Sequence, residues 1–177
     1  MVTVEKKMTN RIIETERLIL RPLTVGDAED AFEWQSDPEV NRYMIYPLYT
    51  DVDRTRAWIA GLGEDVNEFG FELKTTGKVI GAGGINHHAD GDAWELGYNL
   101  NRAYWGMGYA TEASKALIRW AYETHGARDF TAAHATLNTA SGNVIRKCGF
   151  RFDRFGEYSR IDDSETFPAT FYKMHLE

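Results

Sequence analysis

The chain has 177 residues, of which 43% are hydrophobic and 13% aromatic, and its formal net charge is −7 at pH 7. A domain of this length buries about 70% of the surface of its extended chain, so it needs no disulfide or metal to fold. The hydrophobic content excludes a disordered chain, and the acidic balance argues against nucleic-acid binding. The single cysteine, Cys148, excludes an internal disulfide and fits a reducing compartment.

The sequence contains no candidate membrane span and no secretory signal. The longest uncharged apolar run covers residues 79–85, whereas a spanning helix needs about 20 residues. The N-terminal segment MVTVEKKMTNR lacks the apolar stretch of a signal peptide. No linker, repeat or low-complexity stretch divides the chain. We therefore expect a polar lead-in over residues 1–14, one domain over residues 15–177, and a cytoplasmic location without nucleic-acid or membrane partners.

The first part of the chain predicts one strand and two helical segments. Residues 18–22 form a short apolar strand that a proline ends. Asp27 is an N-cap candidate for a helix over residues 28–35, where apolar residues recur at helical spacing. Pro38 directly after Asp37 is typical of a helix start, so a second helical turn is predicted there.

The next segment predicts a third helix and three strands. Thr50 or Asp51 can cap the helix, and Gly63 is expected to end it. The strands, separated by glycine-containing turns, are predicted over residues 69–73, 79–86 and 94–100. In the third strand, alternation places Trp94, Leu96, Tyr98 and Leu100 on one face, and Glu95, Gly97 and Asn99 on the other.

The second half of the chain predicts two helices and three strands. An amphipathic helix is expected over residues 109–124. A strand, a helix and two closing strands follow over residues 130–135, 140–147, 150–158 and 167–176. This order indicates an α+β (mixed α/β) fold with a central antiparallel meander and a strand–helix–strand crossover after it.

The most informative segment is YWGMGYATEA, residues 104–113. Gly106 and Gly108 lie between a predicted strand and a predicted helix, where glycine permits a tight turn and the close approach of a ligand. The free N–H groups of a helix N-terminus favour a phosphate, although a glycine-rich helix entry without a ligand is the alternative. No Gly-Lys-Ser/Thr triplet occurs, and the third glycine of a dinucleotide fingerprint is missing, so neither nucleotide motif is present.

This segment resembles motif A of the GNAT superfamily of acyl-CoA-dependent N-acetyltransferases, Q/R-x-x-G-x-G/A. Gly108 and Ala110 occupy the two small positions, and Trp105 stands where Gln or Arg is usual. That departure is similar to the Rim-type branch, whose members read YWGxGYATEA. Four further segments resemble the same branch in matching order: TERLILRPL, WQSDPEV, ELGYNL and NTASGNVIRKCGF, at residues 15–23, 34–40, 95–100 and 138–150.

The resemblance extends over residues 15–176 and implies a single GNAT domain with a mainly antiparallel central sheet, splayed at the cofactor site and flanked by helices. It implies acetyl-CoA as co-substrate and no metal. Backbone groups of Asn99 and Leu100 would pair with pantetheine and polarise the thioester carbonyl, and the loop at residues 106–110 with Thr111 would hold the pyrophosphate. The implied cofactor-binding residues are Asn99, Leu100, Trp105, Gly106, Met107, Gly108, Tyr109, Ala110, Thr111, Asn138, Asn143, Arg146 and Lys147.

Several of these residues have simpler alternative roles. Asn138 is expected to bond pantetheine, but it is equally an N-cap candidate for the following helix. Arg146 and Lys147 could neutralise the 3′-phosphate of CoA or form an ordinary solvated pair. Cys148 is expected to pack rather than react.

Glu95 and Ser141 are the catalytic candidates. The resemblance places Glu95 where several GNAT enzymes carry a base, acting through water, whereas the alternative is a solvent-facing strand carboxylate. Ser141 would lie near the sulfur and donate its hydroxyl proton to the leaving thiolate, or it could simply be a first-turn helix residue. Tyr98 is disfavoured as the acid because alternation groups it with the large apolar side chains.

Aromatic residues near the first helices are candidates for the acceptor site. Trp34, Tyr43 and Tyr46 could form a substrate wall, with core packing as the alternative. His87, His88 and Asp90 could suggest a metal site, but a turn-adjacent histidine pair without a second cluster favours a solvated turn, so no metal site is predicted.

The sequence therefore predicts an acetyl-CoA-dependent N-acetyltransferase in which a primary amine attacks the thioester directly. The acceptor is expected to be a protein or peptide N-terminal amine or a small amine. An α-amine with a pKa of about 7.7–8.0 is partly neutral near pH 7, unlike a lysine near 10.4. The alternatives are a non-catalytic CoA-binding regulatory module and an antibiotic-modifying acetyltransferase. A monomer or a homodimer is expected.

Overall fold

The computed structural model describes residues 11–63, 66–87 and 91–177, and its centre is one mixed sheet. The strand order in the sheet is β1-β2-β3-β4-β5-β6-β8-β7. The strands are β1 (Ile13–Glu14), β2 (Leu18–Arg21), β3 (Glu68–Leu73), β4 (Val79–His87), β5 (Trp94–Leu100), β6 (Asp129–Ala135), β7 (Arg151–Ser159) and β8 (Thr166–His175).

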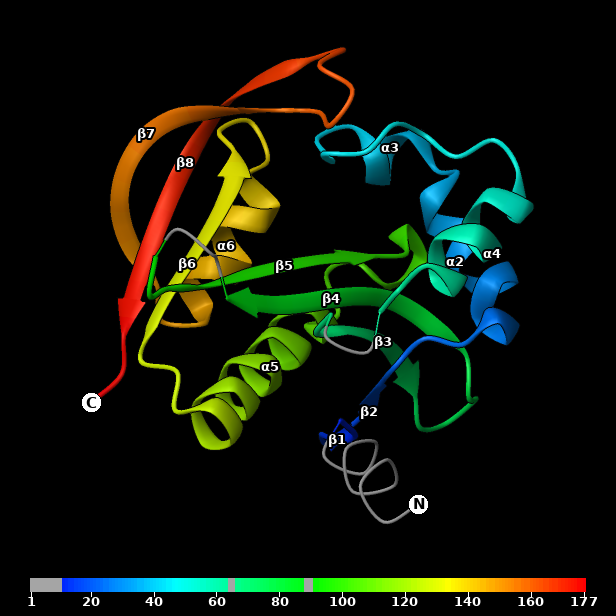
Figure 1. Cartoon of the computed structure of the whole chain (residues 1–177), viewed down its shortest axis with the longest axis horizontal. Helices are drawn as coiled ribbons and strands as arrows, with labels where there is room; N and C mark the ends of the chain where they lie inside the picture. The colour runs from blue at the N-terminus through cyan, green and yellow to red at the C-terminus, as the bar shows by residue number, and fades with distance from the viewer. Residues whose placement is uncertain (1–10, 64–65, 88–90) are drawn as a thin grey trace.

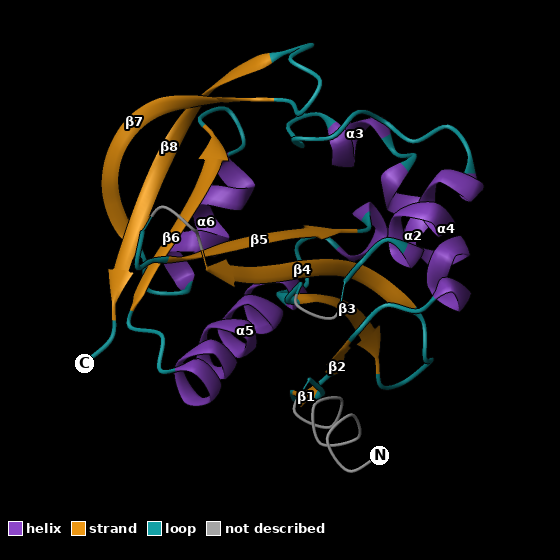
Figure 2. Cartoon of the chain, in the orientation of Figure 1, coloured by secondary structure: helices purple, strands orange, loops and turns teal. Residues whose placement is uncertain are grey.

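Helices cover both faces of this sheet (Figures 1 and 2). They are the 3-10 helices η1 (Val25–Asp27) and η2 (Arg102–Tyr104), and α2 (Ala28–Gln35), α3 (Pro38–Asn41), α4 (Val52–Ala60), α5 (Tyr109–His125) and α6 (Thr139–Lys147). The larger hydrophobic cluster joins α5 and α6 to one face of the sheet, with Leu117 and Ile145 fully covered. The smaller cluster joins α2 and α4 to Val79 and Ala82 on β4.

The sheet opens between β5 and β6. Every other neighbouring pair is antiparallel, whereas β5 and β6 are parallel and pair only at Trp94↔Phe130 and Glu95↔Thr131. Beyond Glu95 the two strands diverge, β5 running towards α2 and β6 towards the β7–β8 hairpin (Figure 1). The predicted α+β fold with a mainly antiparallel, splayed sheet is confirmed.

The predicted elements agree with the structure apart from their ends. The helix predicted to end at Gly63 ends at Ala60, because Gly61 already forms its C-cap. The predicted lead-in is also too long, since Ile13 and Glu14 pair with β2 as strand β1. Asp27 lies at the start of α2 as predicted, but its carboxylate makes no cap.

Candidate active site

The glycine loop before α5 has the backbone geometry that its sequence predicts. Gly106 has φ 74° and Gly108 has φ 85°, a left-handed conformation that side chains with a Cβ rarely adopt. The helix begins directly afterwards at Tyr109, so the N–H groups of its first turn have no partner within the helix. A Cβ at Gly106 would meet no atom within 4 Å, so the loop is open to an approaching ligand.

Arg17, which the sequence analysis did not select, holds this loop in place. Its Nη1 donates to the Met107 carbonyl at 2.9 Å, and its Nε donates to Glu112 on α5 at 2.7 Å. The Thr15 hydroxyl donates to the same carboxylate at 2.6 Å. Burial by itself would raise the pKa of Glu112. The hydrogen bonds stabilise the ionised carboxylate by more than burial disfavours it, so the pKa of Glu112 is lowered overall. The TERL segment at residues 15–18 contained the signal for this contact.

Trp105 connects the loop back to β5. Its Nε1 donates to the Leu100 carbonyl at 2.8 Å, although the side chain stays 44% exposed. The indole therefore fixes the position of the loop relative to the end of the strand, where both predicted cofactor-binding segments meet.

On and next to α6, three of the predicted cofactor residues, Asn138, Asn143 and Arg146, already have hydrogen-bond partners within the protein. Asn138 is the N-cap, and its Oδ1 accepts from the Ser141 N–H at 3.2 Å. Arg146 donates to Asn143 Oδ1 at 2.6 Å and to the Tyr172 hydroxyl at 3.1 Å. Lys147 is exposed. The N-cap alternative for Asn138 is thus present in the structure, and Arg146 is directed partly towards β8.

Tyr98 and Ser141 meet across the opening of the sheet. The Tyr98 hydroxyl lies 2.9 Å from Ser141 Oγ and donates to the Ser141 carbonyl at 3.1 Å. Burial raises the pKa of Tyr98, partly offset by the bond to Ser141. Tyr98 does share its face with apolar side chains, as alternation predicts, but its hydroxyl reaches the catalytic candidate on α6, so the reason given against Tyr98 does not hold.

The opposite face of β5 contains Glu95, Gly97 and Asn99. The Asn99 amide donates to the Tyr46 hydroxyl, and its Oδ1 accepts from the Ala82 N–H at 3.3 Å. Burial raises the pKa of Tyr46, and the charge of a nearby carboxylate, Glu68, raises it further. Tyr46 therefore lies over the centre of the sheet, next to the residues of β5 that were predicted to bind the cofactor.

The three aromatic residues predicted to form an acceptor wall differ in accessibility. Tyr43 and Tyr46 are partly exposed on the loop after α3. Trp34, by contrast, is fully buried among α2, α4 and β4. The prediction of Trp34 as a wall residue is therefore wrong. Trp34 is a core residue, and its side chain supports the helices beneath the loop.

Glu68 at the start of β3 is the second residue that the sequence analysis missed. Burial raises its pKa to about 7, near the working range of a general base at neutral pH. The signal was weak, because a glutamate before an apolar strand reads as an ordinary strand-end residue. Only the pairing of β3 with β4 places it on the face that contains Glu95 and Asn99.

Arg160, in the hairpin between β7 and β8, ties the aromatic loop to the other half of the molecule. Its guanidinium donates to the carbonyls of Met44 and Tyr46 at 3.0 and 2.9 Å and to Glu165 at 3.1 Å. The N–H of the next residue, Ile161, donates to the loop at 2.7 Å. The hairpin thus lies against the loop after α3, as Figure 1 shows.

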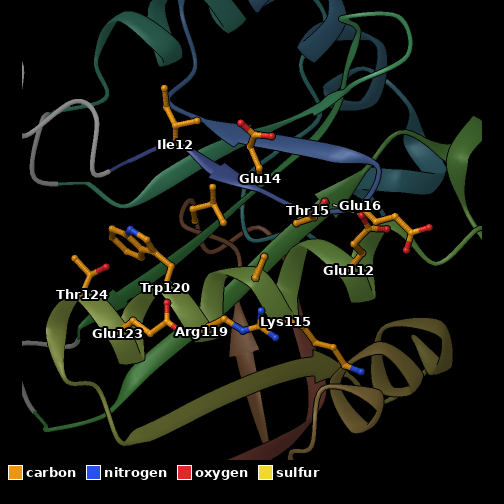
Figure 3. A pocket seen from close by; sticks show the side chains of 12 residues that line it. Ile12, Glu14, Thr15, Glu16, Glu112, Lys115, Arg119, Trp120, Glu123 and Thr124 are labelled. Atoms are coloured by element: carbon orange, nitrogen blue, oxygen red, sulfur yellow. Dashed lines mark hydrogen bonds between the residues drawn. The ribbon is translucent and has the colours of Figure 1, made fainter.

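Two surface hollows lie apart from the predicted catalytic and cofactor-binding residues. One, of about 660 Å³, runs between β1 and α5 and is lined by Glu112, Lys115 and Arg119 among others (Figure 3). The other, of about 740 Å³, lies beside the paired ends of β5 and β6 near Cys148, where burial raises the pKa of the thiol to about 11. No predicted catalytic or cofactor-binding residue lines either hollow.

Within residues 11–63, 66–87 and 91–177, no group of three or more His, Cys, Asp or Glu could hold a metal ion. His88 and Asp90, two of the three candidate ligands, lie outside this part of the chain. No helix in the described part is both long and apolar enough to cross a membrane.

The splayed sheet, the glycine loop and the Tyr98–Ser141 contact together have the geometry of an acyltransferase domain. The sequence pattern of the family described as Acetyltransferase (GNAT) domain matches residues 17–151. The N-acetyltransferase p20 of Bacillus licheniformis, itself uncharacterized, is 34% identical over 144 residues, covering 77% of this chain and 80% of p20. The chain belongs to the GNAT acetyltransferase family.

Solved structures show the same fold. A GNAT-family acetyltransferase from Bacillus anthracis superimposes with a TM-score of 0.84 at 23% identity, covering 93% of this chain and 98% of that one. The microcin C7 self-immunity acetyltransferase MccE, solved with acetyl-CoA and AMP, gives 0.76 at 17% identity, covering 92% and 94%. At these identities the likeness concerns the fold alone.

Proposed function

We propose that this protein transfers the acetyl group of acetyl-CoA to a primary amine, either the N-terminal amine of a protein or peptide or a small amine. The observation that carries the proposal is the opening between β5 and β6 directly beside a glycine loop with two left-handed residues. Such a loop presents backbone N–H groups to a pyrophosphate, and the opening can admit an extended pantetheine arm. We propose a cytoplasmic location and a monomer or homodimer.

The described residues fit acetyl-CoA as a substrate. The first-turn N–H groups of α5, including those of Tyr109, Ala110 and Thr111, are open to hydrogen bonding. Arg17 holds the same loop through its bond to the Met107 carbonyl, while its charge is paired with Glu112. In this proposal the pyrophosphate binds there, pantetheine lies along Asn99 and Leu100, and Lys147 lies near the end of the cofactor.

In this proposal, one proton transfer takes place on each face of β5. The neutral amine attacks the thioester carbon, the C–N bond forms, and the C–S bond breaks as the CoA thiolate leaves. A carboxylate on the face of Glu95 receives the amine proton, directly or through water. On the other face Ser141, hydrogen-bonded to Tyr98, supplies a proton to the thiolate, whose reference pKa is about 8.5. No covalent acyl-enzyme is required.

The acceptor follows from the cost of deprotonation. An α-amine with a pKa of about 7.7–8.0 loses its proton readily near neutral pH, whereas a lysine near 10.4 does not. A carboxylate whose pKa is about 7, such as Glu68, is well matched to the former. This match favours N-terminal or similarly acidic small primary amines.

The test is thiol release from acetyl-CoA with a panel of peptides, amino-acid amides and polyamines, followed by mass spectrometry of the products. We expect a product heavier by one acetyl group with at least one primary amine. Tight binding of acetyl-CoA without acetylation of any amine in the panel would instead indicate a non-catalytic CoA-binding module.

A further inference from the structure

The side chain of Glu68 projects over the middle of the sheet. Glu68 on β3 is paired with Gly84 on β4, and Gly84 is paired with Gly97 on β5. The three residues therefore form one row across the sheet, on the face of Glu95 and Asn99. A Cβ at Gly84 would lie only 2.5 Å from Glu68 Oε2. The carboxylate thus lies directly above Gly84, in the space that any other residue there would fill.

The next position in the row is open. A Cβ at Gly97 would meet no atom within 4 Å, and Gly97 is exposed although it lies in a central strand. Adjacent strands are about 4.8 Å apart, so the Glu68 carboxylate lies within about one strand spacing of this open position. On its far side is the opening between β5 and β6, where the proposed thioester would lie.

The carboxylate is poorly solvated and lacks a charged partner in the described part of the chain. Its side chain is neither fully buried nor fully exposed. Among the described residues, no cation is paired with it, and burial alone raises its pKa. The Asn86 amide nitrogen lies beside the same point above Gly84, 2.9 Å from the position of a Cβ there.

The titratable groups on this face of the surrounding elements are Tyr46 and Tyr49 on the loop above, Glu95 on β5 and Arg21 on β2, which pairs with Gly70. Arg21 is already bonded to Asp27 and Glu72, and Arg54 of α4 lies over the Tyr49 ring. Neither cation bonds to Glu68, so a cationic group from a ligand would be its natural partner.

We propose that Glu68 binds the ammonium group of the acceptor in the open space above Gly97 and takes its proton, making Glu68 a catalytic residue of the acetyl transfer. The proposal rests on the proposed function and deepens it, because it selects acceptors that arrive as primary ammonium ions. Glu95 remains on the same face, one row away, and is not the group whose ionisation limits the reaction.

The proton balance of the step is simple. One N–H bond of the ammonium breaks and an O–H bond forms on Glu68, which leaves a neutral amine and a neutral carboxylic acid. The nitrogen lone pair then forms the C–N bond, and the C–S bond breaks as the thiolate leaves. The second amine proton passes to solvent as the amide forms, the thiolate gains one proton, and Glu68 returns its own to solvent.

Binding can be measured without turnover. The probe is L-alaninamide, titrated into the ¹⁵N-labelled protein with CoA bound while amide shifts are followed. We expect the Gly97 signal to move in the wild type and in Glu123→Gln, a control at an exposed carboxylate on α5. In Glu68→Gln the shift should require at least 10-fold more alaninamide. No Gly97 shift in the wild type, or equal titrations in the wild type and Glu68→Gln, would overturn the proposal.

The pH dependence of kcat/KM with alaninamide tests the proton transfer. If the reaction requires an ionised Glu68 and a protonated amine, the plot of kcat/KM against pH is bell-shaped. It rises through about pH 7 and falls near the amine pKa of about 8. In Glu68→Gln we expect the acidic limb to vanish and kcat/KM at pH 7.5 to fall at least 10²-fold. Glu68→Asp should restore part of the rate together with an acidic limb.

The outcomes separate this inference from the proposed function. Acetylation of alaninamide with an acidic limb that disappears in Glu95→Gln and persists in Glu68→Gln would sustain the proposed function and overturn the inference. A wild type that acetylates no primary amine would remove the proposed function. The Gly97 titration would still decide for or against the ammonium site.

Discussion

The two faces of β5 are built in different ways. The face towards α5 and α6 uses segments that are each continuous in the sequence: the glycine loop at residues 105–108, the first turn of α5, and the start of α6. The opposite face brings together Tyr46, Glu68, Gly84 and Asn99 from separate elements. The first face contains binding groups that are mostly backbone atoms, and the second contains mostly side chains. The cofactor side should therefore tolerate side-chain changes that the acceptor side does not.

After Glu68→Gln, the largest expected effect is on the proposed cofactor side. Gly108→Val should weaken acetyl-CoA binding by about 10- to 100-fold, because a β-branched residue at φ 85° costs about 1–3 kcal/mol and crowds Arg17. Isothermal titration measures the change. The matched control is Gly77→Val, which has φ 73° and open space in a turn between β3 and β4. It should lose stability and keep its affinity. Unchanged affinity in folded Gly108→Val would remove the loop from the cofactor site.

Ser141→Ala tests the proposed acid on the same face. We expect kcat to fall about 10-fold with little change in acetyl-CoA affinity, because the hydroxyl acts on the leaving thiolate and binds no phosphate. Tyr98→Phe removes the partner hydroxyl at 2.9 Å and should lower kcat by a smaller factor. Steady-state kinetics with both substrates separates kcat from KM. A rise in the KM of acetyl-CoA with constant kcat would make Ser141 a binding residue instead.

Arg160→Ala tests the connection between the aromatic loop and the hairpin. Loss of its hydrogen bonds to the Met44 and Tyr46 carbonyls should loosen the loop and raise the KM for the amine about 5-fold, while the KM for acetyl-CoA stays constant. Arg154→Ala, at an exposed arginine on β7, is the control and should leave both values unchanged. Equal changes in both KM values would show that the hairpin supports the whole fold rather than the acceptor side.

Glu68→Gln should also change stability, with a defined pH dependence. The pKa of Glu68 is raised from 4.5 to about 7 in the folded protein, so the folded state binds more protons between these values and loses stability as pH rises. Glu68→Gln lacks this loss. The difference in the free energy of unfolding, variant minus wild type, should therefore be about 2 kcal/mol larger at pH 8 than at pH 5, which means that the substitution stabilises the protein more at pH 8. Urea unfolding at both pH values measures it, and a pH-independent difference would contradict the burial of the carboxylate.

A substitution that stabilises the protein and lowers its activity is the signature of a functional charge held in a poorly solvated place. Glu68→Gln is expected to do both at pH 8. Glu95→Gln provides the comparison on the same face. If Glu68→Gln stabilises the protein at pH 8 and Glu95→Gln does not, Glu68 is the one of these two carboxylates whose charge is held in a poorly solvated place.

Much of this molecule follows from local sequence. The elements, the glycine loop and the alternation of β5 were predictable because each depends on short-range spacing, capping and backbone freedom. The family motifs add the order of these elements, and the N-cap role of Asn138 was already one of two predicted alternatives. The main differences are the end of α4 and the early strand β1, since the end of an element depends on a single hydrogen bond or a neighbouring strand.

The acceptor side was decided by the tertiary structure. The pairing of β3 with β4 and of β4 with β5 places Glu68, Gly84 and Gly97 in one row, and a shift of one residue would turn Glu68 to the other face. Likewise, Trp34 is core rather than wall because α4 and β4 cover it. No local pattern encodes the register between distant strands or the partner that covers a helix. The local sequence therefore determined the glycine loop that we assign to the cofactor, and long-range packing determined which side chains gather on the face that we assign to the acceptor.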